Sequence, residues 1–152
     1  MNRTLSFLRI IYSTYLDEGS RQLIQDDLER FCINMVNNKA EGKNKKSYFN
    51  TLLSICSSPK SCSYLSSVLK GEQDLPEDVT INEHDKISIA FNLVLRDTNV
   101  YEDMKAYIMK TVKNKDLLDR FEYVYPSLSG DKHVRDSVFN ALLVRENRVN
   151  EV

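Results

Sequence analysis

The sequence predicts an all-α protein, and three observations support this fold class. Only four of its 152 residues are glycine and three are proline, whereas an all-β chain builds its many turns from these residues. Hydrophobic residues make up 41% of the chain and recur three and four positions apart, the spacing of one face of an α-helix. Strand-like and helix-like segments do not alternate. We therefore expect about eight helices joined by short loops.

Two helices are expected at the N-terminal end of the chain. Residues 3–16 form the first, and Gly19 supplies the break after it. Ser20 then caps a second helix over residues 20–38, whose outer face carries Glu29 among other polar side chains. The residues expected on the buried faces are Leu5, Leu8, Ile11, Tyr12, Tyr15, Leu16, Ile24, Leu28, Phe31, Cys32, Met35 and Val36.

A lysine-rich segment separates these helices from the next pair. Its lysines are Lys39, Lys43, Lys45 and Lys46, which we expect in a solvated loop, with a phosphate or partner contact as the alternative. Residues 47–58 form the next helix. Ser58 then serves as the N-cap of a short helix, with Pro59 at its first position and Gly71 at its end. Their buried faces are expected to carry Phe49, Leu52, Leu53, Cys56, Cys62, Leu65, Val68 and Leu69.

Residues 72–81 are acidic, contain Pro76 and show no sustained period, so we expect an irregular segment. A helix over 82–97 follows, and the turn Asp97-Thr98-Asn99 leads into another over 100–114. Their buried faces are expected to carry Ile87, Ala90, Phe91, Val94, Leu95, Val100, Met104, Tyr107, Ile108 and Val112.

The stretch 115–148 is the clearest helix pair. Asn114 caps its first helix, and Pro126 is expected to push Tyr125 out of the helical region and end it. Ser129 then caps the second helix. The two apolar faces consist of Leu117, Leu118, Phe121 and Val124, and of Val134, Val138, Ala141 and Leu142.

Such a pair cannot bury both of its apolar faces alone, so it must stack on similar pairs. Antiparallel pairs recur at about 35–45 residues, the period of a HEAT- or armadillo-like array. We expect one all-helical domain over residues 1–152, arranged as such an array, with a compact helical bundle as the alternative. The chain stops at Val152 without a polar terminal cap, which predicts a fragment of a longer chain.

The charge balance and the hydropathy of the chain argue against two classes of partner, nucleic acids and membranes. The chain has 21 basic and 22 acidic residues, so we expect no nucleic-acid partner. No apolar run reaches the roughly 18–20 residues that span a membrane, and the N-terminal segment lacks a signal-peptide cleavage site. We expect no membrane partner, and the sequence does not indicate a compartment. Three cysteines, an odd number, argue against a disulfide framework, although Cys56 and Cys62 could meet across a helical corner.

The sequence offers little catalytic chemistry. His84 and His133 each fall near a predicted helix start, where we expect exposed side chains, and no His-Glu-x-x-His pair is present. Two charged pairs at helical spacing, Asp131 with Arg135 and Glu102 with Lys105, are expected to add only a few tenths of a kcal/mol each. Four tyrosines are expected to pack in the core or at its edge, with a ligand-facing role as the alternative: Tyr101, Tyr107, Tyr123 and Tyr125.

Two segments, 81–97 and 120–148, resemble the C-terminal helical region of aminopeptidase N-like zinc metallopeptidases of the bacterial type. The shared elements are Arg120-Phe121, Pro126, Leu128-Ser129, Val134-Arg135-Asp136, Phe139 and Glu146-Asn147-Arg148. The resemblance covers about seventy residues, whereas residues 1–75 are only compatible with the same helical array.

The resemblance implies a non-catalytic helical domain that covers the zinc-containing catalytic domain of the same polypeptide and shapes the access of peptides to it. The family's zinc ligands, amine-binding motif and transition-state tyrosine have no match in this chain. We therefore assign no catalytic, cofactor-binding or metal-ligating residue, and zinc would belong to the catalytic domain. Two alternatives stay open: a free-standing helical adaptor that binds a partner, and a viral Bcl-2-like bundle with a groove for an amphipathic helix.

Overall fold

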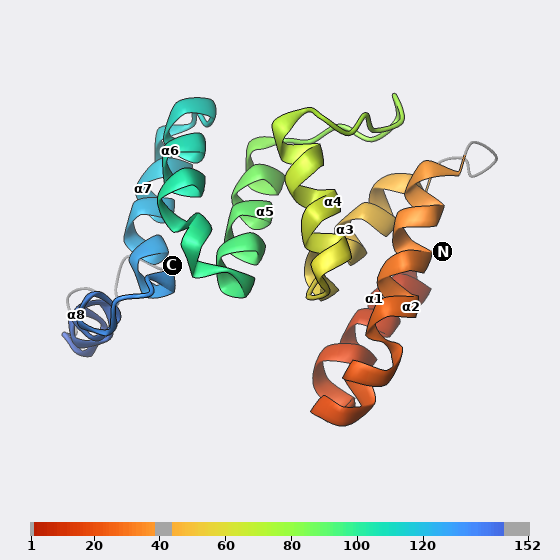
Figure 1. The fold of residues 1–152 in the computed structure, drawn as a ribbon, viewed down its shortest axis with the longest axis horizontal. Helices are drawn as coiled ribbons and strands as arrows, with labels where there is room; N and C mark the ends of the chain where they lie inside the picture. The colour runs from red at the N-terminus through yellow and green to blue at the C-terminus, as the bar shows by residue number, and fades with distance from the viewer. Residues whose placement is uncertain (1, 39–43, 145–152) are drawn as a thin grey trace. The chain divides into compact units, whose positions relative to one another are not determined.

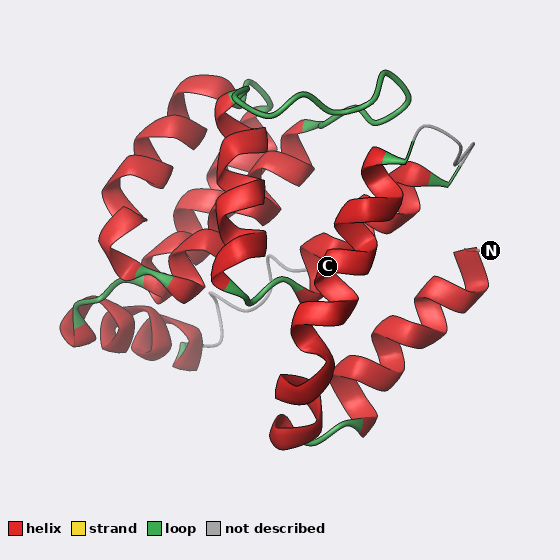
Figure 2. Cartoon of the chain, turned by 45° about the vertical axis from the view of Figure 1, so that its right-hand side comes forward, coloured by secondary structure: helices red, strands yellow, loops and turns green. Residues whose placement is uncertain are grey.

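The computed structural model describes residues 2–38 and 44–144, and every regular element in these ranges is helical. Figure 2 shows helices and loops, and no strand, in these parts of the chain. The prediction of an all-α fold is confirmed. Backbone contacts group the chain into two compact units, Met1–Asn82 and Glu83–Val152. The HEAT-like stacking and the single domain stay predictions.

The described residues of the first unit form four α-helices, labelled in Figure 1. They are α1 (Asn2–Ile10), which continues into a π-helix, η1 (Ile11–Tyr15), then α2 (Glu18–Asn37), α3 (Lys45–Ile55) and α4 (Pro59–Lys70). The helix α3 is central, because both α1 and α2 pack against it. The core of this unit includes Cys32, Val36, Phe49, Leu52 and Leu65, each fully buried.

The π-helical turn changes which side chains of the first helix are buried. Leu5 and Tyr12 are buried as predicted, but Ile11 and Tyr15 are 50% and 76% exposed. The amide of Leu16 donates to the Ile11 carbonyl oxygen, five positions back, so the turn is wider than the α-helical turn assumed by the prediction. The expected burial of Ile11 and Tyr15 is therefore wrong.

The helix α2 begins earlier than predicted and presents a different face to its neighbours. The N-cap is Asp17, whose carboxylate accepts a hydrogen bond from the Ser20 amide at 2.9 Å, so Gly19 lies inside the helix. Its buried residues are Glu29, Cys32 and Val36, which share one face at positions i, i+3 and i+7. The predicted burial of Ile24 and Phe31 is wrong, because the face with Glu29, Cys32 and Val36 is the buried one. Both side chains are more than two-fifths exposed.

Lys45 and Lys46 belong to the first turn of α3 instead of a solvated loop. Lys45 is buried and pairs with Asp78 at 3.1 Å, while the Lys46 ammonium donates to the Thr80 carbonyl oxygen at 2.8 Å. These two contacts fasten the irregular segment 72–81, predicted from the sequence, to α3. Lys39 and Lys43 lie outside the described residues.

The ends of α4 match the prediction. Ser58 is the N-cap, Pro59 occupies the first turn, and Gly71 ends the helix with a φ of 74°. This left-handed conformation favours glycine, because glycine has no Cβ atom to clash with the backbone.

The second unit, as far as residue 144, forms four further α-helices, again labelled in Figure 1. Its elements are α5 (Glu83–Arg96), η2 (Thr98–Val100), α6 (Tyr101–Thr111), α7 (Lys115–Val124), η3 (Tyr125–Leu128) and α8 (Lys132–Leu143), where η2 and η3 are 3₁₀ turns. Asn114 caps α7 as predicted, with its side chain accepting from the Leu117 amide at 3.1 Å. The expected burial of Met104, Ile108 and Val112 is confirmed.

An aromatic cluster forms the core of this unit. Tyr125 lies 4.4 Å from Phe121 and 4.5 Å from Tyr101 between ring centroids, and Phe91 lies 5.7 Å from Phe121. The Tyr125 hydroxyl donates to the Tyr101 carbonyl oxygen at 2.7 Å. Desolvation by these neighbours raises the pKa of the Tyr125 phenol. Tyr125 is therefore a core residue, as the packing prediction proposed.

The corner between α7 and α8 differs from the prediction in two ways. The α-helix ends at Val124, but Tyr125 keeps right-handed helical angles and opens the turn η3. The N-cap of α8 is Asp131, which accepts from the His133 amide at 2.8 Å, while the Ser129 hydroxyl accepts from the Asp131 amide. The chain thus continues past Pro126 as a 3₁₀ turn before α8 begins.

Three expected core positions of this unit are solvent-exposed: Leu95 is 60%, Val124 43% and Leu142 36% exposed. The expected burial of Ala90 and Val94 is confirmed, and α5 buries Ile89 and Leu93 as well. The predicted face of α8 is half-buried at Val134, Val138 and Ala141, and none of the described residues of α8 is fully buried. Glu146-Asn147-Arg148 lies outside the described residues.

Candidate functional site

The two histidines are exposed, as predicted, near the N-terminal ends of α5 and α8. Within residues 2–38 and 44–144, no group of three His, Cys, Asp or Glu side chains could hold a metal ion. Among the helices in these same ranges, none combines the length and the apolar composition needed to cross a membrane. The Arg135 guanidinium donates to the Ser129 carbonyl oxygen instead of pairing with Asp131.

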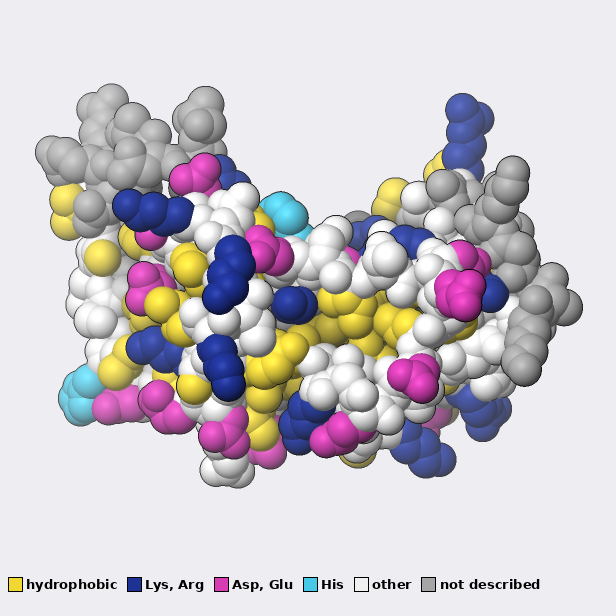
Figure 3. Space-filling model, turned by 90° about the horizontal axis from the view of Figure 1, so that it is seen from above, with side chains coloured by type: hydrophobic (Ala, Val, Ile, Leu, Met, Phe, Trp, Pro, Cys, Tyr) yellow, Lys and Arg dark blue, Asp and Glu magenta, His cyan; other side chains and the backbone are white. Residues whose placement is uncertain are grey.

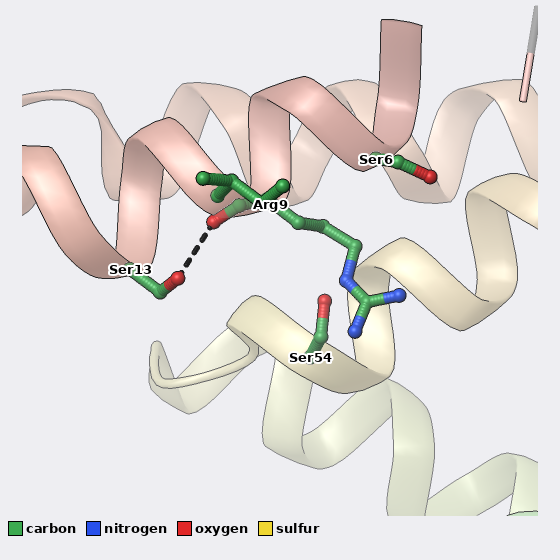
Figure 4. Close-up of a pocket in the computed structure, with 5 residues that line it drawn as sticks. Ser6, Arg9, Ser13 and Ser54 are labelled. Atoms are coloured by element: carbon green, nitrogen blue, oxygen red, sulfur yellow. Dashed lines mark hydrogen bonds between the residues drawn. The ribbon is translucent and has the colours of Figure 1, made fainter. Parts of the chain in front are cut away.

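A hollow in the surface of the first unit lies between α1 and α3. Its volume is about 370 Å³, and Ser6, Arg9, Ile10, Ser13 and Ser54 line it. Figure 4 shows the Arg9 side chain extending from α1 across the hollow toward Ser54 of α3. The Ser13 hydroxyl donates to the backbone carbonyl oxygen of Arg9 at 2.9 Å, and the Arg9 guanidinium points away from α1.

A second hollow of about 170 Å³ shares Ser6 and Arg9 with the first. Its other lining residues are Leu5, Ser47, Asn50 and Thr51. Together the two hollows form one groove along the contact of α1 with α3, which we call the Arg9 groove. Among the described residues that line it, Arg9 is the one charged residue, and the others are serine, threonine and asparagine side chains together with the apolar Leu5 and Ile10.

The local fold explains why Arg9 lies in this groove. Leu5 and Tyr12, four positions before and three positions after it, are the buried residues of this helix. Residues at this spacing share a helical face, so the packing of Leu5 and Tyr12 directs Arg9 toward α3 as well. The long Arg9 side chain remains exposed at its end.

The charge of the groove is uncompensated locally. Residues 2–16 include Arg3 and Arg9 and no acidic residue. Within the described parts of the chain, the Arg9 guanidinium makes no hydrogen bond or ion pair. The planar Arg9 guanidinium is suited to a carboxylate or another oxyanion. The neighbouring hydroxyls of Ser13 and Ser54 already donate to backbone carbonyl oxygens.

Large apolar side chains border the groove on the outer face of the same helix. Phe7, Ile10, Ile11 and Tyr15 are 63%, 49%, 50% and 76% exposed. The first three follow the i, i+3, i+4 spacing, so they form one stripe, which we call the α1 stripe. The face of the molecule drawn in Figure 3 carries basic and acidic side chains that are interspersed with one another and with hydrophobic side chains.

A buried carboxylate lies in the core of the first unit and was missed by the sequence analysis. Glu29 is only 1% exposed, and its carboxylate accepts from the Ser57 amide at 2.7 Å and from the Ser58 amide at 3.2 Å. Both serine hydroxyls donate to it as well. These bonds join the middle of α2 to the corner between α3 and α4. The spacing of Glu29 to Cys32 and Val36 was the available signal, because it places all three on one helical face.

The three cysteines occupy the same region. The Sγ atoms of Cys56 and Cys62 are 3.8 Å apart across the corner between α3 and α4. Cys32 is fully buried, and desolvation, with a smaller contribution from the Glu29 charge, raises the pKa of its thiol to about 12.

No protein-family model, no curated protein and no solved structure matches this chain. We take the Arg9 groove and the α1 stripe together as the candidate site, on the basis of their geometry alone. Sequence reasoning missed this site because four residues of α3, Ser47, Asn50, Thr51 and Ser54, complete the groove. The available signal was an arginine on the same helical face as Leu5 and Tyr12.

Proposed function

We propose that this protein is a non-catalytic helical module that binds an amphipathic helix carrying acidic residues beside its apolar face. The observation that supports it is the exposed α1 stripe, formed by Phe7, Ile10 and Ile11, beside the uncompensated Arg9 groove. This proposal develops the helical-adaptor alternative from the sequence.

The apolar part of the proposed contact rests on the α1 stripe. Contiguous exposed apolar side chains on a helix are a common feature of protein–protein contacts, and an amphipathic partner helix covers them with its own stripe. Tyr15 extends the apolar surface one turn further, and aromatic residues supply much of the energy of such interfaces.

The polar part of the contact determines the charge of the partner. Arg3 and Arg9 are the charged residues of 2–16, so an acidic partner is favoured over a basic one. A carboxylate that enters the Arg9 groove would pair with the Arg9 guanidinium.

The test uses defined helical peptides of about 18 residues, or five turns. One peptide has a leucine stripe bordered by glutamates, the second replaces the glutamates by lysines, and the third has the acidic composition in scrambled order. Fluorescence anisotropy is expected to give saturable binding of the first peptide, weaker by about tenfold or more for the second, which corresponds to about 1.4 kcal/mol.

Matched variants locate the binding surface. Arg9→Glu and Phe7→Ser are expected to weaken binding of the acidic peptide about tenfold each, whereas Arg120→Glu and Phe139→Ser, also exposed, leave it unchanged. Equal affinity for the acidic and basic peptides, or no saturable binding of either, would contradict the proposal.

A second candidate function is the one implied by the aminopeptidase resemblance. In it, the chain is a helical domain that covers the catalytic domain of a zinc aminopeptidase and shapes peptide access. It is favoured by Arg120-Phe121, Pro126 and Val134-Arg135-Asp136 lying in α7, η3 and α8, where Phe121 is buried and Phe139 is 62% exposed. An exposed apolar face on α8 is suited to packing against a further layer of protein.

This second candidate makes one expectation of its own and one that it shares with the first. A His-Glu-x-x-His motif should occur upstream in the same open reading frame, and its absence would remove this candidate. The isolated chain, supplied with zinc, should not cleave aminoacyl-anilide substrates. Turnover that a chelator abolishes would contradict both functions, because both assign the chain no catalysis of its own.

A further inference from the structure

The corner between α3 and α4 brings two thiols together. Cys56 and Cys62 are six positions apart, and their Sγ atoms are 3.8 Å apart, compared with about 2.05 Å in a disulfide. The approach needed to form the bond is therefore small, about 1.8 Å.

The backbone holds both cysteines in place. Cys56 is the C-cap of α3, with its amide donating to the Leu52 carbonyl oxygen at 2.8 Å. Cys62 lies in α4, with its amide donating to the Ser58 carbonyl oxygen at 3.0 Å. Most of the conformational entropy that forming the disulfide would cost is therefore already lost when the chain folds.

The segment between the cysteines is fixed as well. Ser57 and Ser58 bind the buried Glu29 carboxylate through their amides and hydroxyls, and Pro59 restricts the backbone at the start of α4. A bond between Cys56 and Cys62 would close a covalent ring around this Glu29-bound segment.

The two thiols differ in their access to solvent. Cys62 is half-buried, whereas Cys56 is 2% exposed. A reagent from solution therefore reaches Cys62 first, and Cys56 is placed to act as the second thiol.

We propose that Cys56 and Cys62 are a modification site, a thiol pair that closes to a disulfide by exchange with a small-molecule disulfide and locks the corner between α3 and α4. The Cys62 thiolate attacks one sulfur of the reagent, forms a mixed disulfide and releases one small thiolate. Cys56 loses its proton and attacks the Cys62 Sγ atom, which releases the second small thiolate. The protein gives up two electrons and two protons, and the reagent becomes two thiols.

The experiment titrates the full chain with oxidised and reduced glutathione, quenches it with acid and maps the peptides by mass spectrometry. Trypsin separates the cysteines into peptides 31–39, 47–60 and 61–70. Oxidation is expected to join 47–60 to 61–70 with a loss of about 2 Da, while 31–39 keeps its thiol.

Variants and a denaturant control make the result specific. Cys32→Ala should still close the pair, whereas Cys56→Ala should stop at a glutathione adduct on Cys62. In the folded chain the closure constant is expected to be about tenfold or more above that measured in guanidinium chloride, because folding holds the sulfurs together. Linkage of 31–39 to either other peptide, a lasting adduct on Cys62 of the unaltered chain, or equal closure constants in both states would overturn the proposal.

Discussion

At the scale of single residues, the Glu29 carboxylate has the most consequential environment in the protein. It is buried and accepts hydrogen bonds from two amides and two hydroxyls at Ser57 and Ser58. Hydrogen bonds to an ionised group stabilise more than neutral ones, and a donor that faces a carboxylate oxygen loses its acceptor if that oxygen is replaced by an amide NH2 group.

We therefore expect Glu29→Gln to lower the free energy of unfolding by about 1.5–3 kcal/mol, because the new amide nitrogen faces the Ser58 donors. Urea denaturation followed by circular dichroism measures the change. The control is Glu77→Gln, at an exposed position, which is expected to change stability by less than about 0.5 kcal/mol. A loss for Glu29→Gln as small as the control would show that the bonds to Ser57 and Ser58 contribute little.

The buried thiol of Cys32 gives a pH-dependent prediction. Desolvation and the Glu29 charge raise its pKa from the ordinary 9.0 to about 12, so folding favours the neutral thiol. The stabilisation is complete below pH 9 and is lost as the pH rises toward about 12, where the folded form ionises as well. At pH 8, iodoacetamide is expected to label Cys62 about tenfold or more faster than Cys32. Peptide mapping measures both labelling rates. Similar rates for Cys32 and Cys62 in the folded chain would contradict the burial of the Cys32 thiol. A rate difference that persists in denaturant would contradict it as well.

At the scale of helices, the contrast between α7 and α8 is the informative one. Phe121 of α7 is 1% exposed and contacts Phe91 and Tyr125, whereas Phe139 of α8 is 62% exposed. The same residue type thus occupies a core position in one helix and a surface position in the next.

Phe121→Ala is expected to cost about 3–5 kcal/mol, because it removes a buried ring and leaves a cavity in the aromatic cluster. Phe139→Ala serves as the matched control and is expected to cost less than about 1 kcal/mol. Thermal and urea unfolding of both variants would measure the difference. Equal costs would mean that the ring of Phe121 is not held in the core.

Helices and many of their ends were predictable because the signals are local. Ser58, Pro59, Gly71 and Asn114 occupy the cap positions expected of them, since a cap depends on bonds within one turn. At the start of α2, Asp17 and Ser20 are both good capping residues, and the sequence did not distinguish them.

The buried face of each helix was less predictable. The exposure of Ile24 and Leu95 and the burial of Glu29 depend on which neighbour packs against the helix, and apolar spacing alone does not specify that neighbour. The Arg9 groove was not predictable for the same reason, because Ser54 and Asn50 come from α3, some forty residues further along the chain.

At the scale of the whole molecule, contacts divide between Met1–Asn82 and Glu83–Val152. The contacts of Glu29 fall in the first unit and those of Phe121 in the second. We expect the two units to open separately on the time scale of amide hydrogen exchange.

Hydrogen exchange followed by mass spectrometry on the intact chain checks this expectation. Glu29→Gln should speed exchange in peptides from residues 18–70 and leave residues 83–143 unchanged, and Phe121→Ala should do the reverse. If either substitution speeds exchange in both ranges equally, the chain unfolds as one cooperative unit, in agreement with the single domain predicted from the sequence.

The way in which Glu29 is bound also has an evolutionary consequence. Two of its donors are main-chain amides, which every amino acid except proline supplies. Position 57 is therefore free to drift among many residues at modest cost, and position 58 among those that also cap α4. Position 29 has no such freedom, so among descendants of this chain the acid should persist while the serines that bind it are replaced.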